Sequence, residues 1–364
     1  MHAVKVPETY KNRLKRLRAL LSKEGLGAIL VTNLRNIYYL SGFTGSNALL
    51  VVKEGSCDFY SDFRYKEQSA REVRQARIRI PKGSLLDAAV KESGLRRVRR
   101  VGCEAVDLRL ATYTKLRNAL GGRKLAAKAD LVERLRRVKD AGEIAAMQRA
   151  AGIADRAFQE VCRKLRPGKK EREVALEVDY LMRQSGAQRT AFETIVASGP
   201  NGALPHARPG ERKIRKGDLV VFDLGAVWGE YCSDMTRTVA VGGLSPKQRR
   251  MYDLVHRAQQ AGLQAVTSGT RAADVDRAAR QVIEKEGLGK TFGHGLGHGV
   301  GLDVHEAPSL NGKSADRLEP GMTVTVEPGI YLAGWGGIRI EDLVVVRKGA
   351  PELLTRTTKD LIVV

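Results

Sequence analysis

His294-Gly-Leu-Gly-His298-Gly-Val-Gly-Leu-Asp-Val-His305-Glu306 holds half of the six histidines of the chain, spaced four and then seven residues apart. Imidazole is the commonest neutral metal ligand in proteins and the usual proton carrier near pH 7. The four glycines of the segment let the backbone approach another group closely. An ordinary glycine-rich loop explains the histidines less well than a metal or catalytic site, because carboxylates stand at site-like positions elsewhere. These carboxylates are Asp223, Asp234, Glu327 and Glu341.

The length of 364 residues exceeds one comfortable hydrophobic core and predicts two domains, residues 1–130 and 131–364. The glycine pair Gly121-Gly122 and the stretch to Asp130 mark the expected boundary. A hydrophobic content of 43% and a charged content of 29% are typical of a globular protein. No apolar run reaches the ~20 residues that a membrane span needs, and no apolar stretch makes the first residues a secretory signal.

The four cysteines of the chain lie far apart and form no Cys-x-x-Cys pair. They are Cys57, Cys103, Cys162 and Cys232. Disulfides are rare in reducing compartments, so this pattern predicts reduced, buried thiols in a cytoplasmic protein.

The formal net charge of +22 comes mainly from the first domain. Residues 1–130 hold 27 Lys and Arg against 12 Asp and Glu. Phosphate binding to a nucleic acid or a membrane surface is one interpretation of such an excess. We favour an ordinary solvated basic surface, because no nucleic-acid motif accompanies the charge and aromatic residues make up only 5% of the chain.

The first domain alternates strand-like and helix-like patterns, which predicts an α/β fold. The expected strands cover residues 28–31, 47–52 and 99–103, and the expected helices cover residues 10–21, 62–75 and 85–93.

The second domain opens with a helix whose start is marked by Asp140 and Glu143, at the spacing of a capping box. An internal repeat follows, because residues 168–186 match residues 269–287 at an offset of 101. Each window begins and ends with Gly and carries apolar residues at helical spacing. Farther along the chain, His206 and His305 lie at nearly the same distance from the starts of the two copies. A pseudo-twofold repeat would therefore bring these histidines to opposite sides of one cleft.

The segment 217–241 predicts a β-hairpin in which Asp223 and Asp234 face each other across a turn at Trp228-Gly229. Directly opposed residues have Cβ atoms about 4.5–5.5 Å apart, and like charges there destabilise a sheet unless something compensates them. The alternative is that one Asp points to solvent. It fits less well because Asp223 lies within an apolar run, so the pair predicts a bound divalent cation.

Glu327 and Glu341 also lie in apolar, strand-like segments, where isolated carboxylates cost free energy unless they are paired or bind metal. Two Asp, two Glu and one His supply four negative charges, which two divalent ions would balance. The oxygen-rich set suits manganese, and also cobalt, iron or zinc, so ligand type alone leaves the metal open. The spacing and the lack of thiolates exclude a zinc finger.

Five segments carry a resemblance to a known family. They read GDLVVFDLGA from Gly217, YCSDMTRT from Tyr231, HGLGHGVGLDVHE from His294, EPGIY from Glu327 and GIRIED from Gly337. Together they resemble the metallopeptidases of the creatinase/aminopeptidase fold, and within it the Xaa-Pro aminopeptidases and prolidases. The resemblance spans residues 132–346, and residues 36–46 and 62–65 resemble the N-terminal domain of the same family.

The resemblance implies an α/β (α+β) protein. An N-terminal creatinase-like domain would precede a C-terminal pita-bread metallopeptidase domain with an internal pseudo-twofold repeat. The implied site holds two divalent metal ions, with manganese the first expectation, bridged by Asp234 and Glu341. Its full ligand set would be Asp223, Asp234, His298, Glu327 and Glu341.

The resemblance also implies roles for other side chains. His206 corresponds to the histidine on the substrate side, and His305 to its proton-shuttling partner on the oxyanion side. His294 corresponds to a further histidine that lines the pocket. Tyr331 and Arg339 correspond to positions just outside the metal ligands.

The main prediction is a metal-dependent Xaa-Pro aminopeptidase, in which a hydroxide activated by two metal ions attacks the carbonyl before proline and Glu327 relays a proton. A Xaa-Pro dipeptidase (prolidase) is the alternative. The choice depends on whether loops or a partner subunit close the far side of the cleft.

Two further alternatives fit less well. A methionine aminopeptidase could use the same ligands but would leave residues 1–130 unexplained. A non-enzymatic binding module of the same fold is opposed by the complete ligand set. We expect a homodimer that acts on peptides with proline at the second position, with no nucleic-acid or membrane partner.

Overall fold

The computed structural model describes residues 6–121 and 124–364, and the chain divides into two compact units between Arg136 and Arg137. The sequence analysis placed the boundary after residue 130, and Gly122, part of that expected boundary, lies outside the described residues.

Helix α6 (Glu133–Arg136) belongs to the first unit because its side chains bond to Asn36. Arg136 Nη1 donates to Asn36 Oδ1 at 2.8 Å, and Asn36 Nδ2 donates to Glu133 Oε1 at 2.6 Å. Because of these contacts, the first unit ends at Arg136, beyond the glycine-rich stretch where the sequence predicted the boundary.

The first unit is a mixed sheet in the order β4-β3-β2-β1-β5-β6, with β1 parallel to β5 and antiparallel to β2. Its strands are β1 Ala28–Val31, β2 Ala48–Lys53, β3 Cys57–Ser61, β4 Arg77–Arg79, β5 Arg100–Glu104 and β6 Lys124–Lys128. Its main helices are α1 Val6–Lys23, α2 Leu34–Ser41, α3 Lys66–Glu72, α4 Leu85–Glu92 and α5 Leu110–Ala119. Strand β1 is fully buried, as expected for an apolar central strand covered on both faces. The α/β prediction is confirmed.

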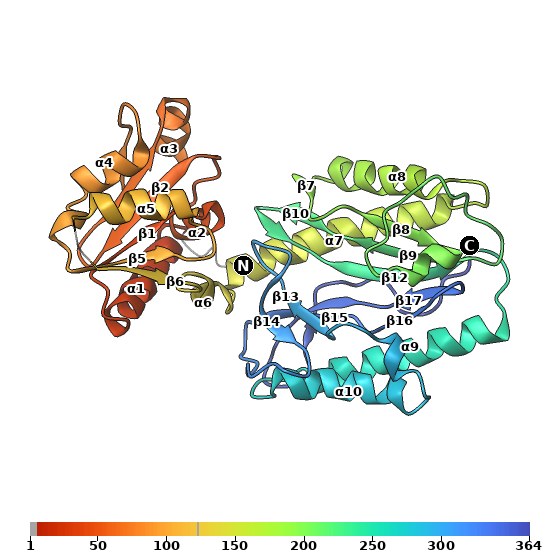
Figure 1. Ribbon diagram of the computed structural model, residues 1–364. Helices are drawn as coiled ribbons and strands as arrows, with labels where there is room; N and C mark the ends of the chain where they lie inside the picture. The colour runs from red at the N-terminus through yellow and green to blue at the C-terminus, as the bar shows by residue number, and fades with distance from the viewer. Residues whose placement is uncertain (1–5, 122–123) are drawn as a thin grey trace. The chain divides into compact units, whose positions relative to one another are not determined.

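The second unit places strands between two helix pairs (Figure 1). The first group of strands is β7 Arg189–Thr190, β8 Ile195–Ser198, β9 Leu219–Leu224, β10 Ala226–Trp228, β11 Tyr231–Cys232 and β12 Met235–Ala240. The second is β13 Gly297–Gly299, β14 Glu306–Leu310, β15 Thr323–Val326, β16 Gly329–Leu332, β17 Gly336–Arg339, β18 Asp342–Val345 and β19 Glu352–Leu353. Helices α7 (Ala141–Lys164) and α8 (Glu171–Gln184) pack on the first group, and α9 (Pro246–Ala265) and α10 (Ala272–Glu284) pack on the second.

Helix α7 starts as its sequence predicts. Asp140 Oδ1 accepts from Glu143 N, and Glu143 Oε2 accepts from Asp140 N, both at 3.0 Å, which completes the capping box. Its apolar face packs on the sheet, where Phe158 meets Phe222 of β9 edge to face at 5.5 Å between ring centroids. With the helices on the outer face of the strands, the opposite face of β9 is left to line the site.

Helices α8 and α10 confirm the two matched windows. Gly168 and Gly269 precede them with φ of +96° and +90°, and Gly186 and Gly287 follow them with φ of +100° and +75°. Only glycine adopts these values without strain, so the glycines fix where each helix begins and ends.

The hairpin prediction is wrong in its register, because Asp223 pairs with Thr236 rather than with Asp234. The two turn residues are Gly229 and Glu230, with φ of +57° and +66°. Two consecutive positive φ values make the type I′ turn that suits a twisted hairpin, and they move its centre one residue along the chain. Asp234 and Thr236 are two residues apart, so their side chains point to the same side of the extended chain. Thr236 is paired with Asp223, so all three side chains share that side.

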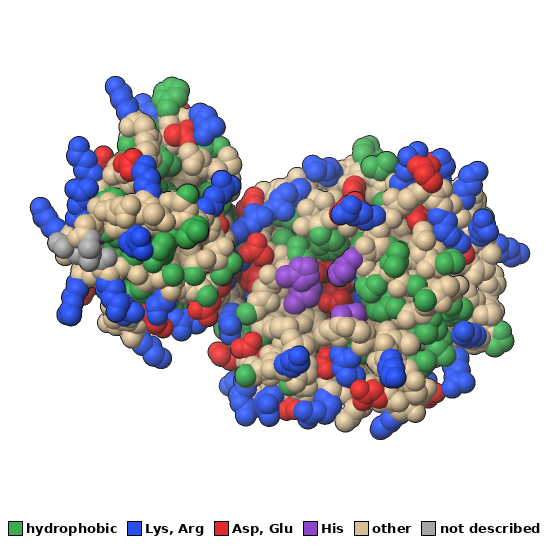
Figure 2. Space-filling model, in the orientation of Figure 1, with side chains coloured by type: hydrophobic (Ala, Val, Ile, Leu, Met, Phe, Trp, Pro, Cys, Tyr) green, Lys and Arg blue, Asp and Glu red, His purple; other side chains and the backbone are tan. Residues whose placement is uncertain are grey.

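Among the described residues, no helix is long and apolar enough to cross a membrane. Lys and Arg side chains are spread over the visible face of each unit rather than gathered in one patch (Figure 2).

Candidate active site

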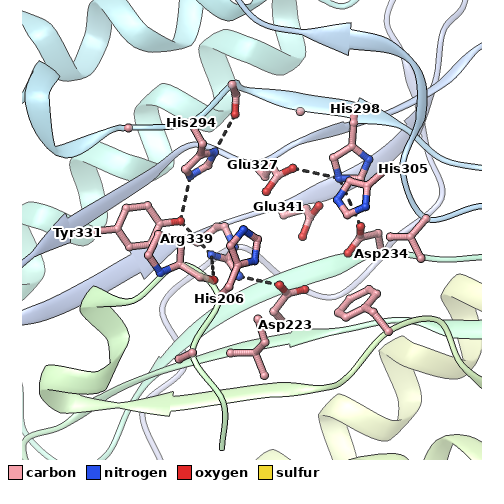
Figure 3. A pocket seen from close by; sticks show the side chains of 18 of the residues that line it. His206, Asp223, Asp234, His294, His298, His305, Glu327, Tyr331, Arg339 and Glu341 are labelled. Carbon is pink, nitrogen blue, oxygen red and sulfur yellow. Dashed lines mark hydrogen bonds and ion pairs between the residues drawn. The ribbon is translucent and has the colours of Figure 1, made fainter.

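A cavity of about 890 Å³ in the second unit brings together all ten side chains that the sequence analysis singled out. They are His206, Asp223, Asp234, His294, His298, His305, Glu327, Tyr331, Arg339 and Glu341 (Figure 3). Both groups of strands contribute, and the histidines surround acidic side chains at the surface of this unit (Figure 2). The segments that carry these residues lie far apart in the sequence and meet only through the fold.

Three side chains lie close enough to share one metal ion. Asp234 precedes β12, His298 lies in β13, and Glu341 lies between β17 and β18. One possible ligand atom from each of the three lies within 4.8 Å of the others. Asp223 and Glu327 line the same cavity beside them (Figure 3).

His298 is held in the orientation that a metal ligand requires. Its Nδ1 lies 3.0 Å from the Gly299 carbonyl oxygen, which only accepts, so Nδ1 carries a proton and donates. Its Nε2 therefore faces the carboxylates, 3.3 Å from Glu327 Oε1 and 3.7 Å from Asp234 Oδ2. Burial lowers the pKa of His298, but the hydrogen bond and charge of Glu327 outweigh that effect and raise it.

The carboxylates repel one another in a buried setting. Burial raises the pKa of Asp234 well above its usual value, and the charges of Glu341 and Asp223 raise it further. Burial and the charges of Glu327 and Asp223 do the same to the pKa of Glu341. Burial would also raise the pKa of Glu327, but the hydrogen bond and charge of His298 outweigh it, so that pKa is lowered. Glu327 is thus the member of the cluster most firmly held as a carboxylate.

Asp223 has one satisfied and one unsatisfied oxygen. Its Oδ2 accepts from Arg339 Nη2 at 2.7 Å, whereas Oδ1 is buried without a hydrogen-bond partner among the described residues. A buried carboxylate oxygen without a partner is costly unless a cation completes it. Burial raises the pKa of Asp223 despite the Arg339 charge, so one guanidinium does not fully compensate this site.

A chain of hydrogen bonds runs from His294 to Asp223 across the pocket (Figure 3). His294 Nδ1 donates to the Gly295 carbonyl oxygen at 2.8 Å, which leaves Nε2 to accept from the Tyr331 hydroxyl at 3.0 Å. The Tyr331 oxygen in turn accepts from Arg339 Nη1 at 2.9 Å. Burial lowers the pKa of His294, which keeps it neutral and able to accept. The chain fixes Arg339 and, through it, Asp223.

His305 and His206 line the cavity beside this cluster. The ring of His305 lies 4.1 Å from that of His298, between centroids. Burial and the neighbouring His298 lower the pKa of His305, which favours its neutral form. His206 is exposed and lies on the segment that follows β8.

Thr236 is a site residue that the sequence analysis missed. Its hydroxyl donates to Glu341 Oε2 at 2.7 Å and accepts from Arg339 Nε at 2.9 Å. The signal that could have found it is the two-residue spacing of Asp234 and Thr236, which puts both side chains on the same side of an extended chain. Phe192, Arg208 and Lys290 also line the cavity and were not anticipated, because nothing in their local sequence marks them.

The donor set fits divalent cations. The carboxylates raise one another's pKa, Asp223 Oδ1 lacks a partner, and His298 presents Nε2 to them. Positive charge placed among these groups would remove both the repulsion and the unsatisfied oxygen. The oxygen-rich composition suits manganese, cobalt, iron or zinc.

Comparison with known proteins identifies both units. Residues 145–348 match metallopeptidase family M24, and residues 13–138 match the creatinase/prolidase N-terminal domain. A curated relative, the Xaa-Pro dipeptidase of Pyrococcus horikoshii, is 35% identical over 352 residues, covering 96% of this chain and 98% of that protein.

Solved structures agree with this similarity. A Xaa-Pro dipeptidase from Bacillus anthracis is 38% identical with a TM-score of 0.95, covering 98% of this chain and 100% of that chain. An X-Pro aminopeptidase from Thermotoga maritima is 36% identical with a TM-score of 0.90, covering 97% of this chain and 100% of that chain.

Proposed function

Because the chain belongs to metallopeptidase family M24, and is thus a metallo-exopeptidase with a creatinase-like domain and a pita-bread domain, we propose that it is a Xaa-Pro dipeptidase. The sequence analysis preferred an aminopeptidase and kept the dipeptidase as its alternative. The names of the P. horikoshii and B. anthracis proteins support the alternative better than that first preference.

The charge distribution in the pocket carries this proposal. Buried carboxylates gather around His298, whereas exposed Arg208 and Lys290 line the same cavity. A dipeptide has an ammonium group at one end and a carboxylate at the other, only two residues apart. Arg208 or Lys290 can pair with the substrate carboxylate, whereas the acidic groups around His298 would be occupied by metal ions. A longer peptide would lack a carboxylate two residues from its amino end.

The proposed metal ligands are Asp223, Asp234, His298, Glu327 and Glu341. Divalent ions held by these side chains would supply Lewis acidity and a water molecule that ionises near neutral pH. Glu327 would accept a proton from that water at a carboxylate oxygen and pass it to the imide nitrogen of proline.

Other side chains bind and orient the substrate. His305 is neutral, so its ring can donate a hydrogen bond to the developing oxyanion. His206 approaches from the exposed side, where the substrate enters. The imide nitrogen of proline has no N–H for a protease to bind, so shape and the contacts of these histidines replace that hydrogen bond.

Hydrolysis of a peptide panel tests the proposal. The purified full chain, supplied with manganese, cobalt or zinc, should cleave Ala-Pro and Met-Pro and leave Ala-Pro-Ala largely intact. Cleavage of Ala-Pro-Ala with little action on Ala-Pro would instead make it an aminopeptidase, as the similarity to the T. maritima enzyme allows. Cleavage of Met-Ala-Ser alone would overturn both assignments.

The finer properties form part of the same proposal: two manganese ions, a homodimer and a cytoplasmic location. The four cysteines are buried and form no disulfide among the described residues, which fits a reducing compartment. Metal analysis of protein purified without added metal, together with light scattering, tests the first two properties.

A further inference from the structure

Glu171 is a buried carboxylate that takes no part in the chemistry described above. It is the first residue of α8, its side chain is fully buried, and it does not line the cavity. A carboxylate in such a place is costly unless hydrogen bonds satisfy it. Its partners therefore indicate what it does.

Among the described residues, the hydrogen-bond donors to the Glu171 carboxylate come from one segment, residues 198–210. Oε1 accepts from Ser198 N and from Ser198 Oγ, both at 2.7 Å. Asn201 Nδ2 donates to Oε1 at 3.1 Å and to Oε2 at 3.0 Å, and Gly210 N donates to Oε2 at 3.3 Å. One carboxylate thus ties the start of the segment, at Ser198 and Asn201, to its end at Gly210.

This segment forms one wall of the cavity. Pro205, His206, Ala207 and Arg208 all line it. The Pro205 carbonyl oxygen accepts from Arg339 Nη1 at 3.1 Å, so the segment is also held from the side of the metal-binding carboxylates.

The segment has little freedom between these two attachments. A Cβ on Gly202 would lie 3.0 Å from Gly337 N of β17, so the two backbones are already in close contact. Loss of the hydrogen bonds to the Glu171 carboxylate would loosen the wall that carries His206. The bond from Arg172 N to the Gly210 carbonyl oxygen, at 3.2 Å, and the bond from Arg339 to Pro205 would stay in place.

A purely structural role is the competing explanation. Carboxylates in the first turn of a helix interact favourably with the helix dipole, and Glu171 could stabilise α8 in that way. Arg212, paired with Asp218 at 2.7 Å, also contacts the Ser198 hydroxyl. A structural role predicts lower stability without a specific effect on His206.

We infer that Glu171 is a positioning residue, which holds the 198–210 segment so that His206 faces the substrate. The kinetic part of this inference rests on the proposed dipeptidase function, whereas the structural part does not. Displacement of a substrate-contacting group by about 1 Å can cost 100-fold in rate.

The test compares Glu171→Gln with a control on the same helix, Glu173→Gln. Glutamine keeps the shape of Glu171 but offers only one acceptor oxygen to the donors of the segment. Glu173 is exposed, and glutamine can still accept from Lys170 N in the capping box. We expect hydrogen exchange of peptides covering residues 198–210 to rise several-fold in Glu171→Gln only, with metal content unchanged.

The kinetic readout is a double-mutant cycle with His206→Ala. We expect Glu171→Gln to lower kcat/KM about 10- to 100-fold in the wild-type background and to add little in the His206→Ala background. Equal losses in both backgrounds, or unchanged exchange in residues 198–210, would overturn the inference. If the wild-type protein cleaves no Xaa-Pro substrate, the proposed function fails, and the exchange experiment alone decides whether Glu171 holds the segment.

Discussion

Helices α8 and α10 occupy matching places in the two halves of the catalytic unit, yet they hold the pocket by different chemistry. Both lie between glycines with positive φ, and each packs against a longer helix, α7 or α9. From α8, a lone carboxylate, Glu171, accepts donors of the segment that carries His206. From α10, the ion pair of Asp276 and Arg280 holds the segment that carries His294.

The difference follows from the backbone groups that each segment presents. Arg280 donates to the carbonyl oxygens of Phe292 and His294 at 2.8 and 2.7 Å, while Asp276 Oδ1 accepts from Leu296 N at 3.0 Å. A segment that offers both carbonyl and N–H groups needs both a donor and an acceptor. The two matching helices therefore use different residues to hold the pocket segment that each contacts.

The site itself lies across both halves. The first half supplies Asp223 and Asp234, and the second supplies the remaining proposed ligands. Bonds also cross between the halves, from Arg339 to Asp223 and from Thr236 to Glu341. Neither half alone could assemble the pocket.

The largest expected effect is the loss of one proposed ligand from either half. Asp234→Ala and Glu341→Ala should each lower the rate of Ala-Pro hydrolysis by at least about 10⁴-fold, more than the loss of a proton-transfer group. Metal bound per chain should fall in both variants, which metal analysis measures beside the rate. Full activity of a chain stripped of metal by a chelator would contradict the ligand assignment.

Replacement of the histidines matched by the repeat should have the next largest effect. His206→Ala and His305→Ala should each lower kcat about 10²- to 10⁴-fold, the range for removal of a group that transfers or orients a proton. Metal content should stay close to that of the wild-type protein, because neither ring is assigned to a metal. Loss of metal in His305→Ala would instead move that residue to the ligand set.

Glu171 and the pair of Asp276 and Arg280, the two anchors of the pocket segments, should contribute differently to the free energy of unfolding. Asp276→Asn leaves Arg280 without this counter-charge, and because the Arg280 side chain is still 24% exposed, breaking the pair should cost about 2–3 kcal/mol. Glu171→Gln leaves no cation without its counter-charge. It should cost about 1–2 kcal/mol, because donors of the 198–210 segment lose their acceptor. Urea unfolding of the two full-length variants measures both values, and the reverse order would show that the anchors are not distinguished by charge.

The smallest expected effect is at the bond between the halves. Thr236→Val removes the hydroxyl that joins Glu341 to Arg339 and should lower activity about tenfold, at the lower end for residues that orient metal ligands. Thr236→Ser keeps the hydroxyl and is the matched control. An unchanged rate in Thr236→Val would show that Glu341 needs no such support.

Local sequence predicted the parts of the fold that depend on a few neighbouring residues. The capping box of Asp140 and Glu143 and the glycine ends of α8 and α10 are confirmed because caps and turns act over about one helical turn. The predicted hairpin register was wrong by two positions, because the turn depends on a positive φ at Glu230. Such a φ is uncommon for a residue other than glycine, so the sequence did not indicate it.

The spacing of Asp, Glu and His, with the resemblance it carries, was enough to select ten of the side chains that line the cavity. The family and the α/β architecture could likewise be recognised in the chain without coordinates. Only the tertiary structure revealed Thr236, Glu171 and the pair of Asp276 and Arg280, because each acts on groups that the folded chain brings near from distant positions. A residue whose own chemistry is typical of a site can be recognised from its type and spacing. A residue that positions another is defined by its contacts, and those contacts exist only in the folded chain.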